Sequence, residues 1–434
     1  MQKSPTILMA VAFSLSLAVM GRAQEDAVQY LPRYYDPVLE EMGERADTLK
    51  SQRDSITSQI RKRQEDLKDA KKESSKELRY DMSGIPAPDS PGVFTSVFHF
   101  PPVRQYRTGT CWSFSSTSFI ESEVARQSGR KIKLSEMHTV YYEYLAKTRR
   151  YVQERGDSWN GEGSEANALI RMMRKHGSVP LEVYPGLPAG ETWHDHSAMS
   201  DEITKYLEFV KSNNFWDEES VIAHVRLILN KHLGEPPASF AFEGKTYTPI
   251  TFFNDVLKLK LDDYVDVMST LSIPYFSQGP FEVPDNWWYD STYYNVPLDQ
   301  WYSALASAAR AGYSIELGGD VSEPGWYGKD NLAVVASFDI PQSHINADSR
   351  EFRFYNRTTT DDHGVHLVGH TTIDGRDWYL IKDSGSSARR GKFDGYFFMR
   401  DDYLRLKMLS FTVHKDAIKE LLSQFPKAAD ANDE

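Results

Sequence analysis

Cysteine is almost absent from this chain, which has 434 residues and contains Cys111 as its only thiol. A single cysteine excludes an internal disulfide, although disulfides are common in exported proteins. The lone thiol is then explained by chemistry, by an intermolecular bridge, or by burial as a small apolar side chain. We favour chemistry because of the residues that surround Cys111.

Clusters of basic residues are also missing. The formal net charge is −12 at pH 7, and no stretch gathers lysine and arginine as phosphate-binding proteins do. We therefore expect no nucleic acid among the partners. Aromatic residues make up 13% of the chain, enough for a substantial core, and the length predicts one large domain or two.

Long apolar runs are rare, and the run at residues 7–20 is too short for a comfortable membrane span. Lys3 precedes it, and Gly21 and Ala23 place small residues at the −3 and −1 positions of a cleavage site. This pattern is typical of a secretory signal peptide over residues 1–23. We expect an exported protein, periplasmic or extracellular, without a membrane span.

A charged extension follows at residues 24–92. Its main part, residues 36–79, is predicted to be helical, since residues 44–83 contain no glycine. Apolar residues recur there at a spacing of three and four, at Leu39, Met42, Ala46, Leu49, Ile56, Ile60, Leu67 and Ala70. Arg53 and Arg63 interrupt this stripe.

Three interpretations of this helix remain open. It could form a coiled coil and so a homo-oligomer, it could cover a binding cleft as a propeptide does, or it could pack on its own domain. The proline-rich residues 84–92 are expected to be a linker, which leaves residues 93–434 for the main domain.

The neighbours of Cys111 place it at the start of a helix. Apolar residues recur at helical spacing from Trp112 onwards, and Gly129 marks the end. Gly109 permits a tight turn just before the helix. The unpaired amides and the dipole of a helix start favour a thiolate, and Gln105 could polarise a developing oxyanion.

This stretch resembles the nucleophile region of the papain-like cysteine peptidases. Their pattern has a glutamine six residues before the cysteine, a glycine two before it and a tryptophan after it. Papain itself has a second cysteine three residues before the nucleophile, where this chain has Thr108. The bleomycin hydrolase and aminopeptidase C branch of the family also lacks that cysteine. Stretches such as residues 234–240 and 248–251 are similar to the same branch.

The resemblance implies an α+β, papain-like fold of two subdomains, a helical one and a twisted antiparallel sheet, with a cleft between them. Cys111 and His363 lie 252 residues apart, against about 130–150 in papain itself. The branch carries such an insertion, which we assign to the mostly helical residues 197–310. Residues 413–425 resemble the branch's final helix.

The same resemblance implies the substrate-binding residues. Residues 161–164 correspond to the family's glycine-rich wall, whose backbone pairs with the substrate. We therefore expect substrate contacts at Gly163, Ser164 and Trp112. Ser164 replaces the second glycine of the family pattern.

Two strands and a turn are predicted around the candidate base. Residues 362–369 and 378–383 have the pattern of strands, and the Asp-Gly pair at 374–375 is a hairpin signal. His363 and Asp383 should then lie roughly opposite each other. Residues 314–320 are predicted to form a further strand of the core.

In papain relatives the histidine opens such a strand, and an asparagine ends the next one before Ser-Trp-Gly. Here Asp383 replaces the asparagine, and Gly385 replaces the tryptophan that shields the pair from water. A carboxylate can still orient an imidazole and raise its pKa. His366 and His370 lie on the other face of the strand and are weaker candidates.

These residues predict an exported cysteine peptidase with a Cys-His-Asp mechanism and peptide substrates. Cys111 attacks as a thiolate, and His363 pairs with it and protonates the leaving amine. Asp383 orients His363, while Gln105 and the Cys111 amide bind the oxyanion. No metal or organic cofactor is expected.

The mode of cleavage and two other functions stay open. In the branch the chain's own C-terminus restricts the enzyme to amino-terminal trimming, so the acidic residues 427–434 favour an aminopeptidase over an endopeptidase. A frayed, solvated tail is the alternative. The changes at Ser164, Asp383 and Gly385 would suit a weak or inactive papain-fold binding protein, and acyl transfer or wall-peptide cleavage is a third possibility.

Two further motifs carry little weight. The sequence His194-Asp195-His196 is half of a metal site at most, and a solvated loop is the simpler interpretation. Residues 356–358 fit the glycosylation sequon.

Overall fold

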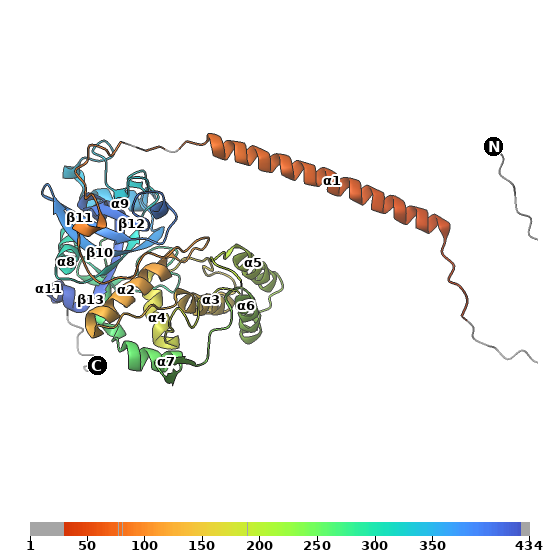
Figure 1. Cartoon of the computed structure of the whole chain (residues 1–434), viewed down its shortest axis with the longest axis horizontal. Helices are drawn as coiled ribbons and strands as arrows, with labels where there is room; N and C mark the ends of the chain where they lie inside the picture. The colour runs from red at the N-terminus through yellow and green to blue at the C-terminus, as the bar shows by residue number, and fades with distance from the viewer. Residues whose placement is uncertain (1–29, 77, 80, 189, 427–434) are drawn as a thin grey trace, which may run out of the picture. The chain divides into compact units, whose positions relative to one another are not determined.

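The computed structural model describes residues 30–76, 78–79, 81–188 and 190–426 (Figure 1). The chain divides into two compact units, residues 1–77 and 78–434, each of which is described by itself. The predicted signal peptide and the acidic tail at residues 427–434 lie outside the described residues.

The first unit contains helix α1 (Pro37–Ser74), which is 38 residues long. The Asp36 carboxylate caps its start by accepting the Val38 N–H at 2.9 Å. No residue of α1 is buried. Its apolar stripe is therefore exposed along its length, at Leu39, Met42, Leu49, Ile56, Ile60 and Leu67.

A sheet of 11 strands runs through the second unit. Its order is β5-β6-β4-β13-β7-β10-β11-β12-β9-β8, and β1 pairs with β10. The central strands from β4 to β12 in this order are antiparallel, while β6 and β9 join in parallel. The strands are β1 (Thr95–Ser96), β4 (Tyr264–Met268), β5 (Ser277–Gly279), β6 (Tyr293–Asn295), β7 (Ile315–Gly319), β8 (Trp326–Tyr327), β9 (Leu332–Ala333), β10 (His363–Ile373), β11 (Arg376–Lys382), β12 (Tyr396–Arg400) and β13 (Met408–His414).

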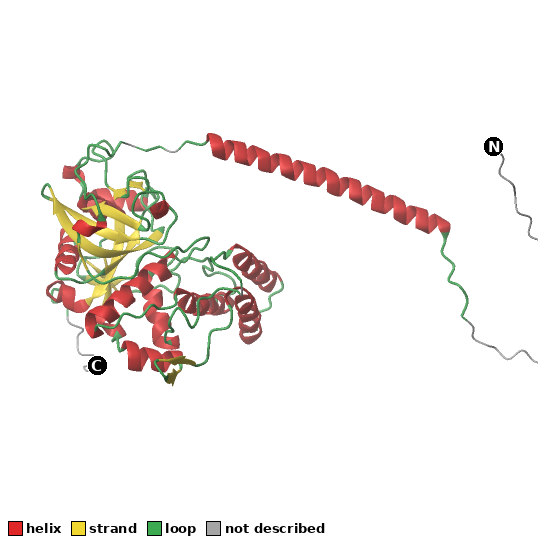
Figure 2. Ribbon diagram, viewed as in Figure 1, coloured by secondary structure: helices red, strands yellow, loops and turns green. Residues whose placement is uncertain are grey.

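In this unit, helices α2 to α7 lie together on one side of the sheet, and α8 packs against its other face (Figure 1, with helices red and strands yellow in Figure 2). The helices are α2 (Cys111–Ser128), α3 (Glu136–Gln153), α4 (Ala166–His176), α5 (Ser197–Ser212), α6 (Glu218–Leu233), α7 (Pro249–Phe252), α8 (Leu298–Arg310), α9 (Ala347–Tyr355), α10 (Asp401–Lys407) and α11 (Lys419–Leu422). A small hairpin, β2 (Phe240–Phe242) and β3 (Lys245–Tyr247), stands apart from the large sheet. None of the helices described is both long and apolar enough to cross a bilayer.

Helix α2 joins the helical group to the sheet by packing on β10. At their contact the Ser118 hydroxyl lies 2.8 Å from His366 Nδ1 and accepts from Lys382 Nζ at 2.8 Å. Burial and the neighbouring Lys382 hold the pKa of His366 well below its ordinary value. His366 is thus a neutral structural histidine, as its place on the second face of the strand suggested.

The predicted hairpin is confirmed. Asp374 and Gly375 both have positive φ, 48° and 74°, which is the backbone of a tight two-residue turn. Strands β10 and β11 pair from this turn to His366 and Lys382, with a bulge in β10 between Leu367 and Gly369. Asp383 therefore follows the last pair by one residue, and only its side chain reaches back to the start of β10.

Residues 197–310, expected to be a mostly helical insertion, contain α5 to α8, and β4 and β6 from the same range enter the large sheet. One expectation about the end of the chain is wrong. Residues 413–425 do not form one final helix, since β13 extends to His414 and lies between β4 and β7. Every residue of β13 is buried, and a segment buried on both faces carries no strand periodicity in its sequence.

The second unit also includes part of the expected linker. Met82 is buried beside Phe94, and Ile85 and Ala87 pack against the same small core. Apolar residues spaced between prolines are thus used for packing here, so the packed unit begins before residue 93.

Candidate active site

Cys111 is the first residue of α2, and its side chain is partly exposed. Thr110 precedes it as the N-cap residue but makes no side-chain cap hydrogen bond. The helix ends at Gly129, whose φ of 72° is the left-handed conformation that glycine tolerates. Because the first amides of a helix have no intrahelical acceptor, the start of α2 presents free N–H groups and a positive dipole end to the Cys111 thiol.

His363 opens β10 and is held by Asp383, with 2.7 Å between His363 Nε2 and Asp383 Oδ1. Burial alone would lower the pKa of His363, but the Asp383 carboxylate and the Cys111 thiol together raise it well above the ordinary value. Burial likewise opposes ionisation of Asp383, yet His363 and the Gly385 N–H hold the pKa of Asp383 below its usual range. The two side chains therefore form a buried ion pair beside the thiol.

Gly385 lies directly against this pair, where the family pattern has a tryptophan. A Cβ on Gly385 would sit 3.2 Å from Asp383 Oδ1 and 3.3 Å from the His363 ring. Its N–H donates to Asp383 Oδ1 at 2.7 Å. The His363 side chain is only 10% exposed and that of Asp383 is fully buried, so the pair is shielded from water without an indole.

Gln105 lies on the approach to α2 with its side-chain amide fixed at both ends. Nε2 donates to the Thr108 carbonyl at 2.8 Å, and Oε1 accepts from the Ser384 hydroxyl at 2.8 Å. The Gln105 N–H also donates to the Ser384 carbonyl at 3.1 Å. One N–H of the amide stays available for an oxyanion, and Ser384, which sequence reasoning missed, fixes the direction in which it points.

The glycine-rich segment at residues 161–164 packs against the start of α2. Glu162 accepts from the Gly109 N–H at 2.6 Å, and its carbonyl accepts from Trp112 Nε1 at 3.2 Å. Lys147 donates to the carbonyls of Gly161 and Gly163. Neither Glu162 nor Lys147 has a sequence signal that singles it out, because their role depends on contacts across the helical subdomain.

The predicted substrate residues are placed in two different ways. Gly163 has room for no side chain, since a Cβ would lie 2.1 Å from Asp285 Oδ2. Trp112 is 2% exposed and Ser164 is 6% exposed, and the Ser164 hydroxyl donates to Glu143 Oε1 at 2.7 Å. The side chains of Trp112 and Ser164 therefore support the wall from behind, and a contact with substrate would fall to the backbone.

The His194-Asp195-His196 sequence lies in a loop before α5. The rings of the two histidines are 6.0 Å apart, and Asp195 binds Arg107 and caps the Ser197 N–H. Across the residues that the structure covers, no group of three or more His, Cys, Asp or Glu side chains has an arrangement that could hold a metal ion.

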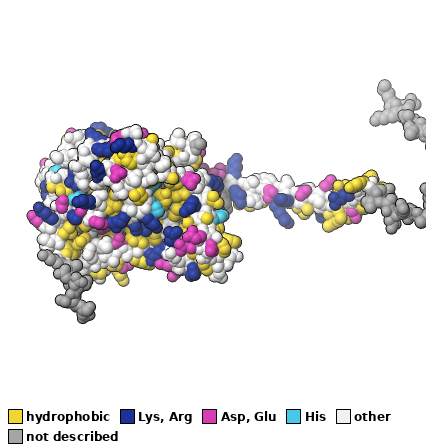
Figure 3. Space-filling model, turned by 90° about the horizontal axis from the view of Figure 1, so that it is seen from below, with side chains coloured by type: hydrophobic (Ala, Val, Ile, Leu, Met, Phe, Trp, Pro, Cys, Tyr) yellow, Lys and Arg dark blue, Asp and Glu magenta, His cyan; other side chains and the backbone are white. Residues whose placement is uncertain are grey.

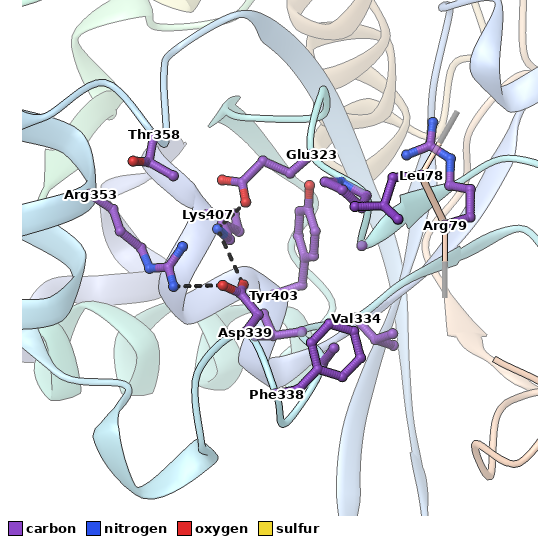
Figure 4. Close-up of a pocket in the computed structure, with 14 residues that line it drawn as sticks. Leu78, Arg79, Glu323, Val334, Phe338, Asp339, Arg353, Thr358, Tyr403 and Lys407 are labelled. Carbon is purple, nitrogen blue, oxygen red and sulfur yellow. Dashed lines mark hydrogen bonds and ion pairs between the residues drawn. The ribbon is translucent and has the colours of Figure 1, made fainter. Parts of the chain in front are cut away.

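A separate cavity of about 340 Å³ lies away from Cys111 (Figure 4). Lys407 points into it and pairs with Glu323, while Arg353 pairs with Asp339 at 2.8 Å. Its walls are otherwise largely apolar, with Phe338 at the rim. Because the charges satisfy one another, this cavity shows ion pairs that stabilise the fold and adds nothing to the chemistry of Cys111.

Charged side chains of both signs are mixed on the molecular surface (Figure 3). Figure 3 shows Lys and Arg side chains interspersed with Asp and Glu over the face in view. Such mixing provides no continuous positive field for phosphates on this face.

Comparison with known proteins gives relatives that cover most of the chain. The sequence profile of the Peptidase C1-like family matches residues 90–430. Aminopeptidase G of Lactobacillus delbrueckii subsp. lactis is 23% identical over 372 residues, covering 74% of this chain and 84% of that protein. Aminopeptidase C of Streptococcus thermophilus is 24% identical over 369 residues, with coverages of 72% and 80%.

Among solved structures, PepW from Lactobacillus rhamnosis HN001 superposes with a TM-score of 0.59 at 18% identity. The superposition covers 83% of this chain and 92% of PepW. This likeness confirms the expected α+β arrangement of a helical subdomain and a sheet.

Proposed function

Because this chain belongs to the Peptidase C1-like family, we propose that it is an exported thiol aminopeptidase in which Cys111, His363 and Asp383 carry out the chemistry. Family membership confirms the resemblance to papain-like peptidases of the bleomycin hydrolase and aminopeptidase C branch, and with it the assignment as a cysteine peptidase. The observation that carries the proposed mechanism is the 2.7 Å bond between His363 and Asp383, formed beside a thiol at a helix start.

The mechanism follows from the charges of these groups. The raised pKa of His363 keeps the imidazole protonated, so that the Cys111 thiolate is stabilised as its ion-pair partner. The thiolate attacks the peptide carbonyl, and the oxyanion is met by the Cys111 N–H and the free N–H of Gln105. His363 then gives its proton to the leaving amine, and water, activated by the neutral imidazole, releases the acyl group.

Amino-terminal trimming is supported by the aminopeptidases among the relatives. The acidic residues 427–434 are proposed to pair with the ammonium of the substrate. An inactive binding protein is the second candidate, and its support is the departures from the family pattern at Ser164, Asp383 and Gly385.

A panel of fluorogenic peptides with free and acetylated amino termini tests this function. The wild type should cleave free-amine peptides, and both iodoacetamide and Cys111→Ala should abolish cleavage. Deletion of residues 427–434 should add activity on acetylated peptides. Absence of thiol-dependent cleavage across the panel would favour the binding protein, and equal cleavage of free and acetylated peptides by the wild type would indicate an endopeptidase.

Export and oligomerisation are proposed from the amino-terminal extension. Residues 1–23 are proposed to be removed as a signal peptide, which mass spectrometry of the protein secreted by an expression host would reveal. The exposed stripe of α1 is proposed to pair with a second copy. Light scattering should then give a dimer or larger for residues 24–434 and a monomer once residues 24–77 are removed.

A further inference from the structure

Three carboxyl groups, two of them buried and one partly buried, lie next to the candidate active site and have no part in the mechanism above. Glu165 follows the glycine-rich segment and is 4% exposed. Asp361 precedes His363 by two residues, and Glu316 lies on β7, paired in register with His366 of β10. The group thus joins the helical subdomain to the sheet at the level of His363.

Glu165 and Asp361 bring unsatisfied oxygens into this group. Glu165 is the N-cap residue of α4, yet its carboxylate makes no cap hydrogen bond. Its Oε1 and Asp361 Oδ1 are both buried, and no N–H or hydroxyl group of the described residues donates to either. The two carboxyl groups instead lie within hydrogen-bonding reach of each other, an arrangement that requires a shared proton.

The surroundings of this pair are acidic. Burial and the facing Asp361 raise the pKa of Glu165 well above its ordinary value, and burial raises the pKa of Asp361 and of Glu316 to about 8 each. No lysine or arginine among the described residues forms an ion pair with any of the three. The other ionisable groups that face them are Asp266, Asp285, Asp320, Asp362, Tyr293 and His363.

Two of these carboxyl groups pack closely against glycines of the strands. A Cβ on Gly318 would lie 3.2 Å from Asp361 Oδ1, and one on Gly364 would lie 3.1 Å from Glu316 Oε1. Glu316 Oε1 accepts from the Ser115 hydroxyl at 2.8 Å, one turn after Cys111 on α2. Asp361 and Glu316 therefore pack against bare backbone, and Glu316 lies on the side of the thiol.

We propose that Glu165, Asp361 and Glu316 form a subsite for a cationic group of the peptide substrate. An ammonium or guanidinium would displace the shared proton and give the buried oxygens the donors that they lack. The group is either a lysine or arginine side chain or the free amino terminus. This proposal rests on the proposed peptidase function, since it gives that enzyme its substrate class.

Peptide binding to the Cys111→Ala protein, measured by calorimetry, tests the subsite without turnover. The probes are acetylated tetra-alanine amides with lysine or its uncharged analogue norleucine at the first, second or third position, and tetra-alanine amide with and without the acetyl group. At one position, lysine should bind about tenfold to a hundredfold more tightly than norleucine. If the amino terminus is the occupant, the free-amine peptide should show that advantage over the acetylated one.

Charge-removing variants then assign the effect to the subsite. Glu165→Gln and Asp361→Asn, each made in the Cys111→Ala protein, should reduce the advantage of the cationic peptide to about twofold or less. The matched control is Asp262→Asn, an exposed carboxylate that pairs with Arg174 and should retain the full advantage. Circular dichroism checks each fold, and either carboxyl variant alone is sufficient if the other does not fold.

The outcomes separate the two proposals. Equal binding of cationic and neutral peptides, or an advantage that survives both carboxyl variants, would overturn the subsite and leave the peptidase function standing. If no peptide binds to the folded Cys111→Ala protein, the proposed function fails and the subsite fails with it.

Discussion

Two carboxyl groups flank His363, the buried Asp383 and the partly buried Asp361, and their pKa values are shifted in opposite directions. Asp383 faces the imidazole at 2.7 Å, and its pKa lies below the usual range. Asp361 faces Glu165, and its pKa is raised to about 8. Burial acts against ionisation at both places. At Asp361 burial prevails, whereas at Asp383 the charge on His363 and the Gly385 N–H outweigh it.

The comparison explains how an ion pair and a shared proton can both lie close to one histidine. An opposite charge within a few ångströms lowers a carboxyl pKa by about one to three pH units, whereas burial without a partner raises it by up to about three to five. Asp383 is thus part of a stable charged pair. Asp361 and Glu165 form a group that is poised to lose its proton when a cation arrives.

The largest effect is expected from removing the imidazole of the ion pair between His363 and Asp383. His363→Ala should reduce kcat by about 10³–10⁴-fold, because both the ion-pair partner and the proton donor are lost. In the same variant, the labelling of Cys111 by iodoacetamide near neutral pH should slow sharply, as mass spectrometry would show. The control is His370→Ala on the same strand, which should keep both properties. Equal labelling of wild type and His363→Ala would contradict the ion pair.

A smaller loss is expected at the oxyanion. Gln105→Ala should lower kcat by about 10²–10³-fold, because one fixed donor is removed, with little change in iodoacetamide labelling. Ser384→Ala should cost less, about tenfold, since it frees the orientation of the Gln105 amide without removing it. Steady-state kinetics on one fluorogenic peptide measures both, and a Gln105→Ala enzyme with full kcat would remove Gln105 from the mechanism.

Asp383→Asn tests the charge at the pair and should cost less than tenfold in kcat, because the amide oxygen can still accept from His363. The imidazolium loses its opposite charge, so the pKa of His363 falls. Activity requires the protonated form and is lost as the pH rises through this pKa, so the alkaline limb of kcat/KM should move to lower pH. Asp377→Asn, on β11 but bonded to Arg310, should leave the limb in place. An unmoved limb in Asp383→Asn would mean that Asp383 does not tune the base.

The smallest expected effect is on the stability of the folded protein, through the protonated Asp361. The raised pKa of Asp361 means that the folded protein binds more protons than the unfolded chain between about pH 4 and about pH 8. Stability from this proton is present at low pH and is lost as the pH rises through that window. Asp361→Asn removes this titration. Between pH 5 and pH 9 the Tm of the wild type should therefore fall further than the Tm of the variant, by a few degrees. Parallel changes of Tm in the two proteins would show that no proton is shared.

Much of the site could be predicted from local sequence because it depends on short-range rules. The helix after Cys111 and its end at Gly129 follow from apolar spacing and from the conformational freedom of glycine. The turn at Asp374 and Gly375 follows from the positive φ that a tight hairpin needs, and it brings His363 within reach of Asp383. The charged helix α1 was also predictable, because the sequence of this region has no glycine between residues 44 and 83 and has apolar residues at helical spacing.

The rest was decided by tertiary structure. Strand β13 is buried on both faces at the centre of the sheet, so its sequence had no alternation to distinguish it from a helix. Ser384 and Glu162 acquired their roles only when distant segments met. The charge states of Asp383 and Asp361 could not be predicted from their sequence positions either. The sequence alone determined that carboxylates stand near His363, and the fold decided which of them faces a cation and which faces another acid, because a buried pKa depends on its neighbours in space.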